Sequence, residues 1–148
     1  MYATWLDNLV VVAATLAAVA LSVLTHYEGL YFTSRRLARL AGVPRRAKVL
    51  YGISAVLVLH VVEIWIFGVT TWVLLRWPEF GALGPAAQHL FDAIYFSAVT
   101  FTTVGYGDLA PVGPIRFLAG TEALTGFVLL TWSASFTYLE MERFWRAS

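Results

Sequence analysis

Three long runs of apolar residues dominate the sequence. They extend from Leu9 to Leu24 (and on to Tyr27), from Val49 to Leu75 and from Ile115 to Leu139. A helix needs about 20 mostly apolar residues to cross the hydrocarbon core of a bilayer, so each run predicts a membrane-spanning helix. A fourth apolar run, Phe91 to Phe101, is too short to cross. It predicts a re-entrant helix that is covered by surrounding protein.

These runs organise the chain as a single all-α membrane domain with short tails. Gly42 and Pro44 interrupt the polar stretch after the first span, and Leu30–Ala41 fits a short interfacial helix that ends before them. The expected divisions are a first transmembrane helix in 1–29, a basic loop in 30–48, a second membrane region in 49–140 and a tail in 141–148. Within 49–140 we expect an outer helix over 49–76, a short helix over 91–102, a loop over 103–107 and a last helix over 114–140.

Composition agrees with a membrane protein. The 148 residues are 59% hydrophobic and only 13% charged, with a mean hydropathy of +0.73. These values exclude a water-soluble globular domain and a disordered chain. The absence of cysteine excludes a disulfide scaffold, and the net charge of +1 gives no indication of a nucleic-acid partner.

The basic residues predict the orientation in the membrane. Because cytoplasmic loops carry the excess of Lys and Arg, we expect the N-terminus outside and the C-terminus in the cytoplasm, in the plasma membrane. No Lys or Arg precedes the first span, so it is expected to be a retained helix and not a signal peptide. The basic residues between the first two spans, which we also expect to contact anionic lipid headgroups, are Arg35, Arg36, Arg39, Arg45, Arg46 and Lys48.

The short apolar run leads into the most informative segment of the chain. Asp92 is a candidate N-cap for the short helix, whose C-terminal end would point its partial negative charge into the membrane. The next residues, Thr103 to Gly107, read Thr-Val-Gly-Tyr-Gly, with Thr102 before them and Asp108 after them. In this segment the sequence resembles the potassium-channel family, whose selectivity filter has that five-residue signature. The resemblance extends over Val49 to about Leu139.

The resemblance implies a site built from backbone oxygens. Carbonyl groups can replace the hydration shell of a potassium ion if they all face one axis, and Gly105 and Gly107 can adopt the positive φ that this requires. The implied ligands are the carbonyls of Thr103, Val104, Gly105 and Tyr106, together with the Thr103 hydroxyl. No cofactor, no catalytic residue and no metal other than the permeant potassium ion are expected.

The resemblance also implies supporting residues around the filter. Thr102 precedes the filter, and Asp108 is expected to tie it to the short helix. The side chains of Val104 and Tyr106 are expected to point away from the axis and to pack against Tyr95 and Phe96. One chain supplies one carbonyl to each ring, so the filter requires a homotetramer.

The last span is then the helix that lines the cavity. Gly126 fits either a hinge or a point of close helix packing. In the register that this sets, Phe127, Leu130, Thr131 and Ala134 face the cavity.

Three ionisable residues lie deep inside the predicted spans. His60 and Glu63 share one helix face, and Glu122 lies at a similar depth on the last span, so a cluster of the three behind the filter is expected. Glu63 or Glu122 could replace the acid that many family members have where this chain has Val99. The alternative is a protonated carboxyl that is only hydrogen-bonded inside the bundle. His26 and His89 lie near the predicted interfaces and are expected to be solvated and not to be metal ligands.

The function that this pattern favours is passive, potassium-selective conduction. The alternatives are a weakly selective or non-conducting cation-channel subunit, and a small transporter that uses His60, Glu63 and Glu122 as a proton relay. No span has Arg at every third position, so the sequence does not indicate a voltage sensor or any other gating stimulus.

Overall fold

The computed structural model describes residues 4–40, 42–84 and 89–146. Within these residues there is no β-strand, only an isolated antiparallel bridge between Ala82 and Val112. The all-α fold that the sequence predicts is therefore confirmed. The helices are α1 (Trp5–Arg39), α2 (Arg45–Leu74), the 3-10 helix η1 (Pro78–Phe80), α3 (Leu90–Phe101) and α4 (Arg116–Arg146).

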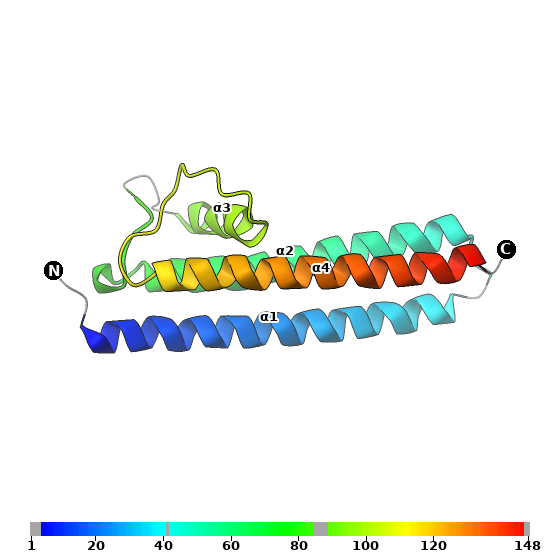
Figure 1. Ribbon diagram of the computed structural model, residues 1–148, viewed down its shortest axis with the longest axis horizontal. Coiled ribbons are helices and arrows are strands. Elements are labelled where there is room, and N and C mark those ends of the chain that lie inside the picture. The colour runs from blue at the N-terminus through cyan, green and yellow to red at the C-terminus, as the bar shows by residue number, and fades with distance from the viewer. Residues whose placement is uncertain (1–3, 41, 85–88, 147–148) are drawn as a thin grey trace.

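The three long helices lie side by side, and α3 lies near one end of the bundle (Figure 1). α1 and α4 run in the same direction and α2 runs in the opposite one. Each of the three is long and apolar enough to cross a membrane, whereas α3 is not. α3 packs against α2 and α4 at the end where α2 finishes and α4 begins, which is the end that holds the Thr-Val-Gly-Tyr-Gly loop.

The first helix is longer than the sequence analysis expected. α1 continues without a break to Arg39, so the segment from Leu30 onward is part of it and not a separate interfacial helix. α1 is continuous through Gly29. The absence of a side chain at Gly29 leaves room for Leu59 of α2, since a Cβ there would lie 2.7 Å from a Leu59 methyl carbon. α2 starts directly after Pro44, so the basic residues lie on the facing ends of two helices. Ala41 lies outside the described residues.

The other boundaries differ by smaller amounts. α2 begins earlier than residue 49, and α4 extends beyond 140 to Arg146, through most of the expected tail. Residues 147 and 148 lie outside the described part. Near the same end of the bundle, the Ser34 hydroxyl of α1 donates to the Glu140 carboxylate of α4 at 3.3 Å.

The start of α3 corrects one prediction. Its N-cap is His89 and not Asp92. Asp92 lies in the first turn, where its carboxylate accepts a hydrogen bond from the His89 amide at 2.9 Å. A carboxylate in the first turn of a helix can reach back and satisfy a free amide in this way, so the residue still stabilises the start of the helix.

Two glycines set the position of α3. Gly68 of α2 faces Ile94, and a Cβ at Gly68 would lie 2.9 Å from the Ile94 Cα. Gly126 of α4 faces the last turn of α3, and a Cβ there would lie 2.7 Å from the Phe101 carbonyl carbon. α2 and α4 therefore both approach the backbone of α3 more closely than any side chain would allow.

Candidate functional site

In the loop that follows α3, the backbone φ angle alternates between positive and negative values. φ is +60° at Thr103, +54° at Gly105 and +80° at Gly107, and it is not positive at Val104 or Tyr106. In an ordinary strand successive carbonyls point to opposite sides, and a left-handed residue at every second position brings them to one side. The positive φ of Thr103 was not anticipated. A β-branched residue in this region is strained by about 1–2 kcal/mol, so the surrounding structure must hold it there.

Short backbone bonds attach this loop to the end of α3. The Thr103 amide donates to the Thr100 carbonyl at 2.9 Å, and the Gly105 amide donates to the Val99 carbonyl at 3.0 Å. Among the described residues, no hydrogen bond is made to the carbonyls of residues 103 to 106. The loop is exposed from Thr102 to Asp108, so these four consecutive carbonyl oxygens are available to an external ligand.

A side-chain bond joins the outer end of the loop to α3. The Tyr95 hydroxyl donates to the Asp108 carboxylate at 2.8 Å. This bond raises the pKa of Tyr95 above its ordinary value of 10.0, because loss of the hydroxyl proton would place two negative charges together. At the inner end, the Thr102 hydroxyl donates to the Ala98 carbonyl at 2.7 Å.

The side chains of Val104 and Tyr106 project away from the chain. Val104 is 55% exposed and Tyr106 is 72% exposed. Phe96 is buried beside Leu83 and Ala119. The packing of Val104 and Tyr106 against Tyr95 and Phe96 stays a prediction.

The residues of α4 that are predicted to line a cavity differ in their exposure. Phe127, Thr131 and Ala134 are exposed in the single chain, and Leu130 is half-buried against the apolar core. Gly126 is buried in an unbroken α4 against the backbone of Phe101. Of the two interpretations of Gly126, this arrangement agrees with close packing.

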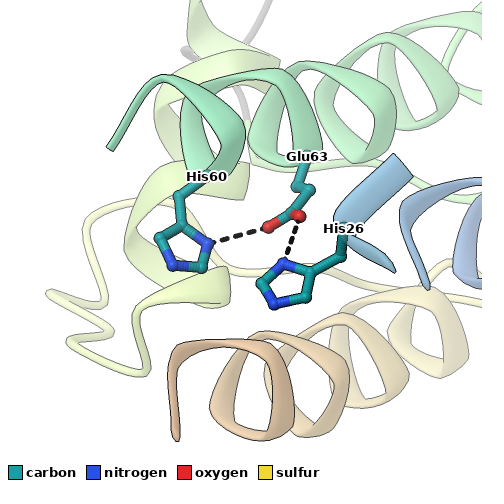
Figure 2. Close-up of side chains that lie close together, drawn as sticks. All are labelled: His26, His60 and Glu63. Atoms are coloured by element: carbon teal, nitrogen blue, oxygen red, sulfur yellow. Dashed lines mark hydrogen bonds and ion pairs between the residues drawn. The ribbon is translucent and has the colours of Figure 1, made fainter. Parts of the chain in front are cut away.

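A buried polar cluster connects α1 to α2 (Figure 2). Glu63 accepts from both of its neighbours: His26 Nδ1 lies 2.7 Å from one carboxylate oxygen, and His60 Nδ1 lies 2.8 Å from the other. Trp132 and Ser133 of α4 flank His26; the Trp132 ring centroid is 5.1 Å away, and the Ser133 hydroxyl is 3.5 Å from Nε2.

The prediction that His26 is solvated was wrong, since its side chain is fully buried. A signal for this was present in the sequence. Thr15, Ala18, Ser22 and His26 follow each other at intervals of three or four residues, which places them on one face of a helix, and all four are buried in α1.

Glu122 does not join the cluster. It is fully buried, and neither of its carboxylate oxygens has a hydrogen-bond partner within the described part of the chain. Its neighbour is Ser97 of α3, whose hydroxyl lies close to it but outside hydrogen-bond geometry. Glu122 faces α3, whereas Glu63 faces α1.

Comparison with known proteins agrees with these features. A family model described as "Ion channel" matches residues 53–139, more than half of the chain. Protein LctB from Geobacillus stearothermophilus is 44% identical over 48 residues, which are 32% of this chain and 36% of that protein. The inward rectifier potassium channel Kirbac3.1 from Paramagnetospirillum magnetotacticum is 43% identical over 53 residues, which are 35% of this chain and 18% of that protein.

A voltage-gated potassium channel from Aeropyrum pernix is 47% identical over 45 residues, 30% of this chain and 15% of that protein. The matches thus cover only about a third or less of these relatives. No solved structure matches the chain significantly. The matched residues include α3, the loop after it and α2 from residue 53 onward, and the family is one of ion channels and not of enzymes. The chain is a membrane protein that belongs to the ion-channel family described by this model, and its relatives include potassium channels.

Proposed function

We propose that four copies of this chain form a potassium-selective channel that conducts passively across the plasma membrane. The observation that carries the proposal is the row of four carbonyl groups, at residues 103 to 106, that have no donor within the described chain. The backbone φ angle is positive at every second residue of this loop. The C-terminal end of α3, which carries a partial negative charge, lies directly before the loop and would attract a cation bound there. Rings of such carbonyls can replace the water around a dehydrated potassium ion.

The proposed assembly has one copy of the loop on each side of a fourfold axis. A single chain leaves Val104 and Tyr106 exposed, and it leaves Phe127, Thr131 and Ala134 of α4 uncovered. A fourfold arrangement would bring Val104 and Tyr106 against neighbouring copies and turn the α4 face toward the axis. The pore domain in this proposal is residues 49–140, with α1 packed outside it and no cofactor required.

The proposed orientation follows from the charges at the helix ends. The last turn of α1 carries Arg36 and Arg39, and α2 begins with Arg45 and Arg46. These four residues lie at the end of the bundle opposite the filter loop. The positive-inside rule then places the filter near the outer surface and the C-terminus in the cytoplasm.

The test is the ion selectivity of the purified protein in lipid bilayers. With opposed potassium and sodium gradients, we expect a reversal potential close to the potassium equilibrium potential. Gly105→Ala should lower the ratio of potassium to sodium permeability by about tenfold or more, which equals about 1.4 kcal/mol, and so shift the reversal potential toward zero. The reason is that alanine is strained at a φ of +54° and would turn the carbonyls of the loop.

Gly84→Ala is the matched control for this test. Gly84 also has a positive φ, and a Cβ there also meets nothing within 4 Å, but the residue lies outside the filter. We expect Gly84→Ala to retain selectivity. A reversal potential near zero for the unmodified protein would indicate a weakly selective channel, and a complete absence of flux would indicate a non-conducting subunit. A proton relay is not favoured, because Glu122 is separated from His60 and Glu63 and lacks a partner in the described chain.

A further inference from the structure

We propose that His26, His60 and Glu63 form a binding site for a divalent transition-metal ion of the zinc class, which links α1 to α2. The site does not depend on ion conduction, and it lies outside the filter. His26 of α1 precedes the segment that the family model matches, whereas His60 and Glu63 of α2 lie within it.

The three side chains already converge on one point. The Nδ1 atoms of both imidazoles face the Glu63 carboxylate, at 2.7 and 2.8 Å from its two oxygens (Figure 2). One ligand atom from each residue can be chosen so that all three lie within 4.8 Å of one another. Ligands around a tetrahedral zinc ion at about 2.0–2.1 Å are about 3.3 Å apart, so a small separation of the side chains would admit the ion.

The chemistry of the three ligands selects the ion. Two neutral imidazoles and one carboxylate suit zinc and its neighbours in the transition series, whereas magnesium and calcium prefer oxygen ligands. The buried carboxylate also needs a positive charge, and its ion-pair partners within the described residues are the two histidines. A divalent cation would supply that charge without protonating either ring.

The surroundings fit a metal-bound histidine. A neutral imidazole that binds metal through Nδ1 carries its proton on Nε2, and this proton needs an acceptor. The Ser133 hydroxyl lies 3.5 Å from His26 Nε2 and can accept it. On the other side, His60 borders a groove of about 440 Å³ between α2 and α4, so this side of the cluster has room for a fourth ligand such as water.

The test is direct metal binding to the purified full-length chain, prepared without a histidine tag and stripped with a chelator. Cobalt(II) serves as the spectroscopic probe and zinc as its competitor. We expect one cobalt ion per chain, with the intense visible absorption of a four-coordinate site, and we expect zinc to displace it. The chain has three histidines and no cysteine, so His89 is the only other imidazole that could bind the probe.

The variants separate ligation from folding. His26→Asn and His60→Asn each keep an N–H group that can face Glu63 but remove the imidazole ligand. We expect each to weaken cobalt binding by about 100-fold or more. His89→Gln, which changes the exposed histidine at the start of α3, should bind like the unmodified protein. Size-exclusion profiles check the fold of every variant, and the two Asn variants test the site independently of each other.

Two results would overturn the proposal. One is that the unmodified chain retains no cobalt or zinc after dialysis. The other is that the affinity is unchanged in His26→Asn and His60→Asn or is lost in His89→Gln. In either case the imidazoles serve Glu63 only as hydrogen-bond donors.

Discussion

Substituting Gly126 by alanine is the most direct test of how α3 is held. The added Cβ would lie 2.7 Å from the Phe101 carbonyl carbon and 2.9 Å from its Cα, and closer still to the carbonyl oxygen. Carbon atoms in contact are normally about 3.5–4.0 Å apart. The obstacle is backbone, which cannot rotate away as a side chain can, so α4 and α3 must separate by about 1 Å.

Two opposing effects decide the magnitude. Alanine inside a helix is more favourable than glycine by about 1 kcal/mol. Forcing extra volume into a packed interior costs about 1–3 kcal/mol, and a backbone collision belongs at the upper end of that range. We therefore expect Gly126→Ala to destabilise the folded protein by about 1–2 kcal/mol. For a chain of this length that corresponds to a fall of about 2–8 °C in the melting temperature.

Gly120→Ala provides the control in the same helix. A Cβ at Gly120 meets nothing within 4 Å, so this variant should gain helix propensity without a collision and be as stable as the unmodified protein or more so. The assay is the melting temperature of the purified protein in detergent, measured by fluorescence together with the size-exclusion profile. If Gly126→Ala melts at or above the temperature of Gly120→Ala, the close contact between α4 and the end of α3 is refuted.

Three further predictions concern the contacts around α3 and the buried carboxyls. Tyr95→Phe removes the hydrogen bond to Asp108 and should accelerate the decay of the potassium current. In the unmodified protein we expect the same faster decay at alkaline pH. The pKa of Tyr95 is raised, so the hydroxyl stays protonated and bonded below the ordinary value of 10.0, and the bond is lost as the pH rises through the raised pKa. Gly68→Ala should lower the melting temperature, since its Cβ would collide with the α3 backbone. Glu63→Gln should destabilise the folded protein by about 1–3 kcal/mol, because one buried imidazole loses its hydrogen-bond acceptor. Glu122→Gln should leave the melting temperature nearly unchanged, because the Glu122 carboxyl has no hydrogen-bond partner in the described chain.

Each of these predictions has a result that contradicts it. Currents of Tyr95→Phe that decay at the unmodified rate at every pH would show that the hydroxyl bond does not support the filter. Gly52→Ala is the control for Gly68→Ala, because a Cβ at Gly52 would lie at an ordinary 3.7 Å from Leu37; equal melting temperatures would argue against the close approach at Gly68. Equal effects of Glu63→Gln and Glu122→Gln would mean that the two histidines do not depend on Glu63.

The long helices could be predicted because bilayer thickness fixes the length of an apolar run. Their ends could not be predicted in the same way. Beyond Leu30, Arg35, Arg36 and Arg39 lower the hydropathy, and hydropathy alone does not distinguish a helix that continues out of the membrane from a separate interfacial helix. In this chain no glycine or proline occurs from Leu30 to Arg39, and α1 continues to Arg39.

The filter loop was accessible to sequence analysis because its residues are consecutive. The positive φ of Gly105 and Gly107 follows from residue type. That of Thr103 does not, because a β-branched residue rarely adopts this conformation, and it results from the alternation that the neighbouring residues impose.

The buried cluster was predicted only in part because its members are far apart in the chain. His60 and Glu63 are one helical turn apart, so their common face could be derived from spacing. The pairing of His26 with Glu63 depends on which helix packs against α2. The expected depth of Glu122 in the membrane did not determine which face of α4 it occupies.

The contacts between α1 and α4 restrict how these two helices can separate. His26 lies beside Ser133, and farther along the same two helices Ser34 bonds to Glu140. An outward bend of α4 in this region must break both contacts or carry α1 with it. A displacement of α1 in this region would in turn disturb the last turns of α4, although α1 is remote in sequence from that helix.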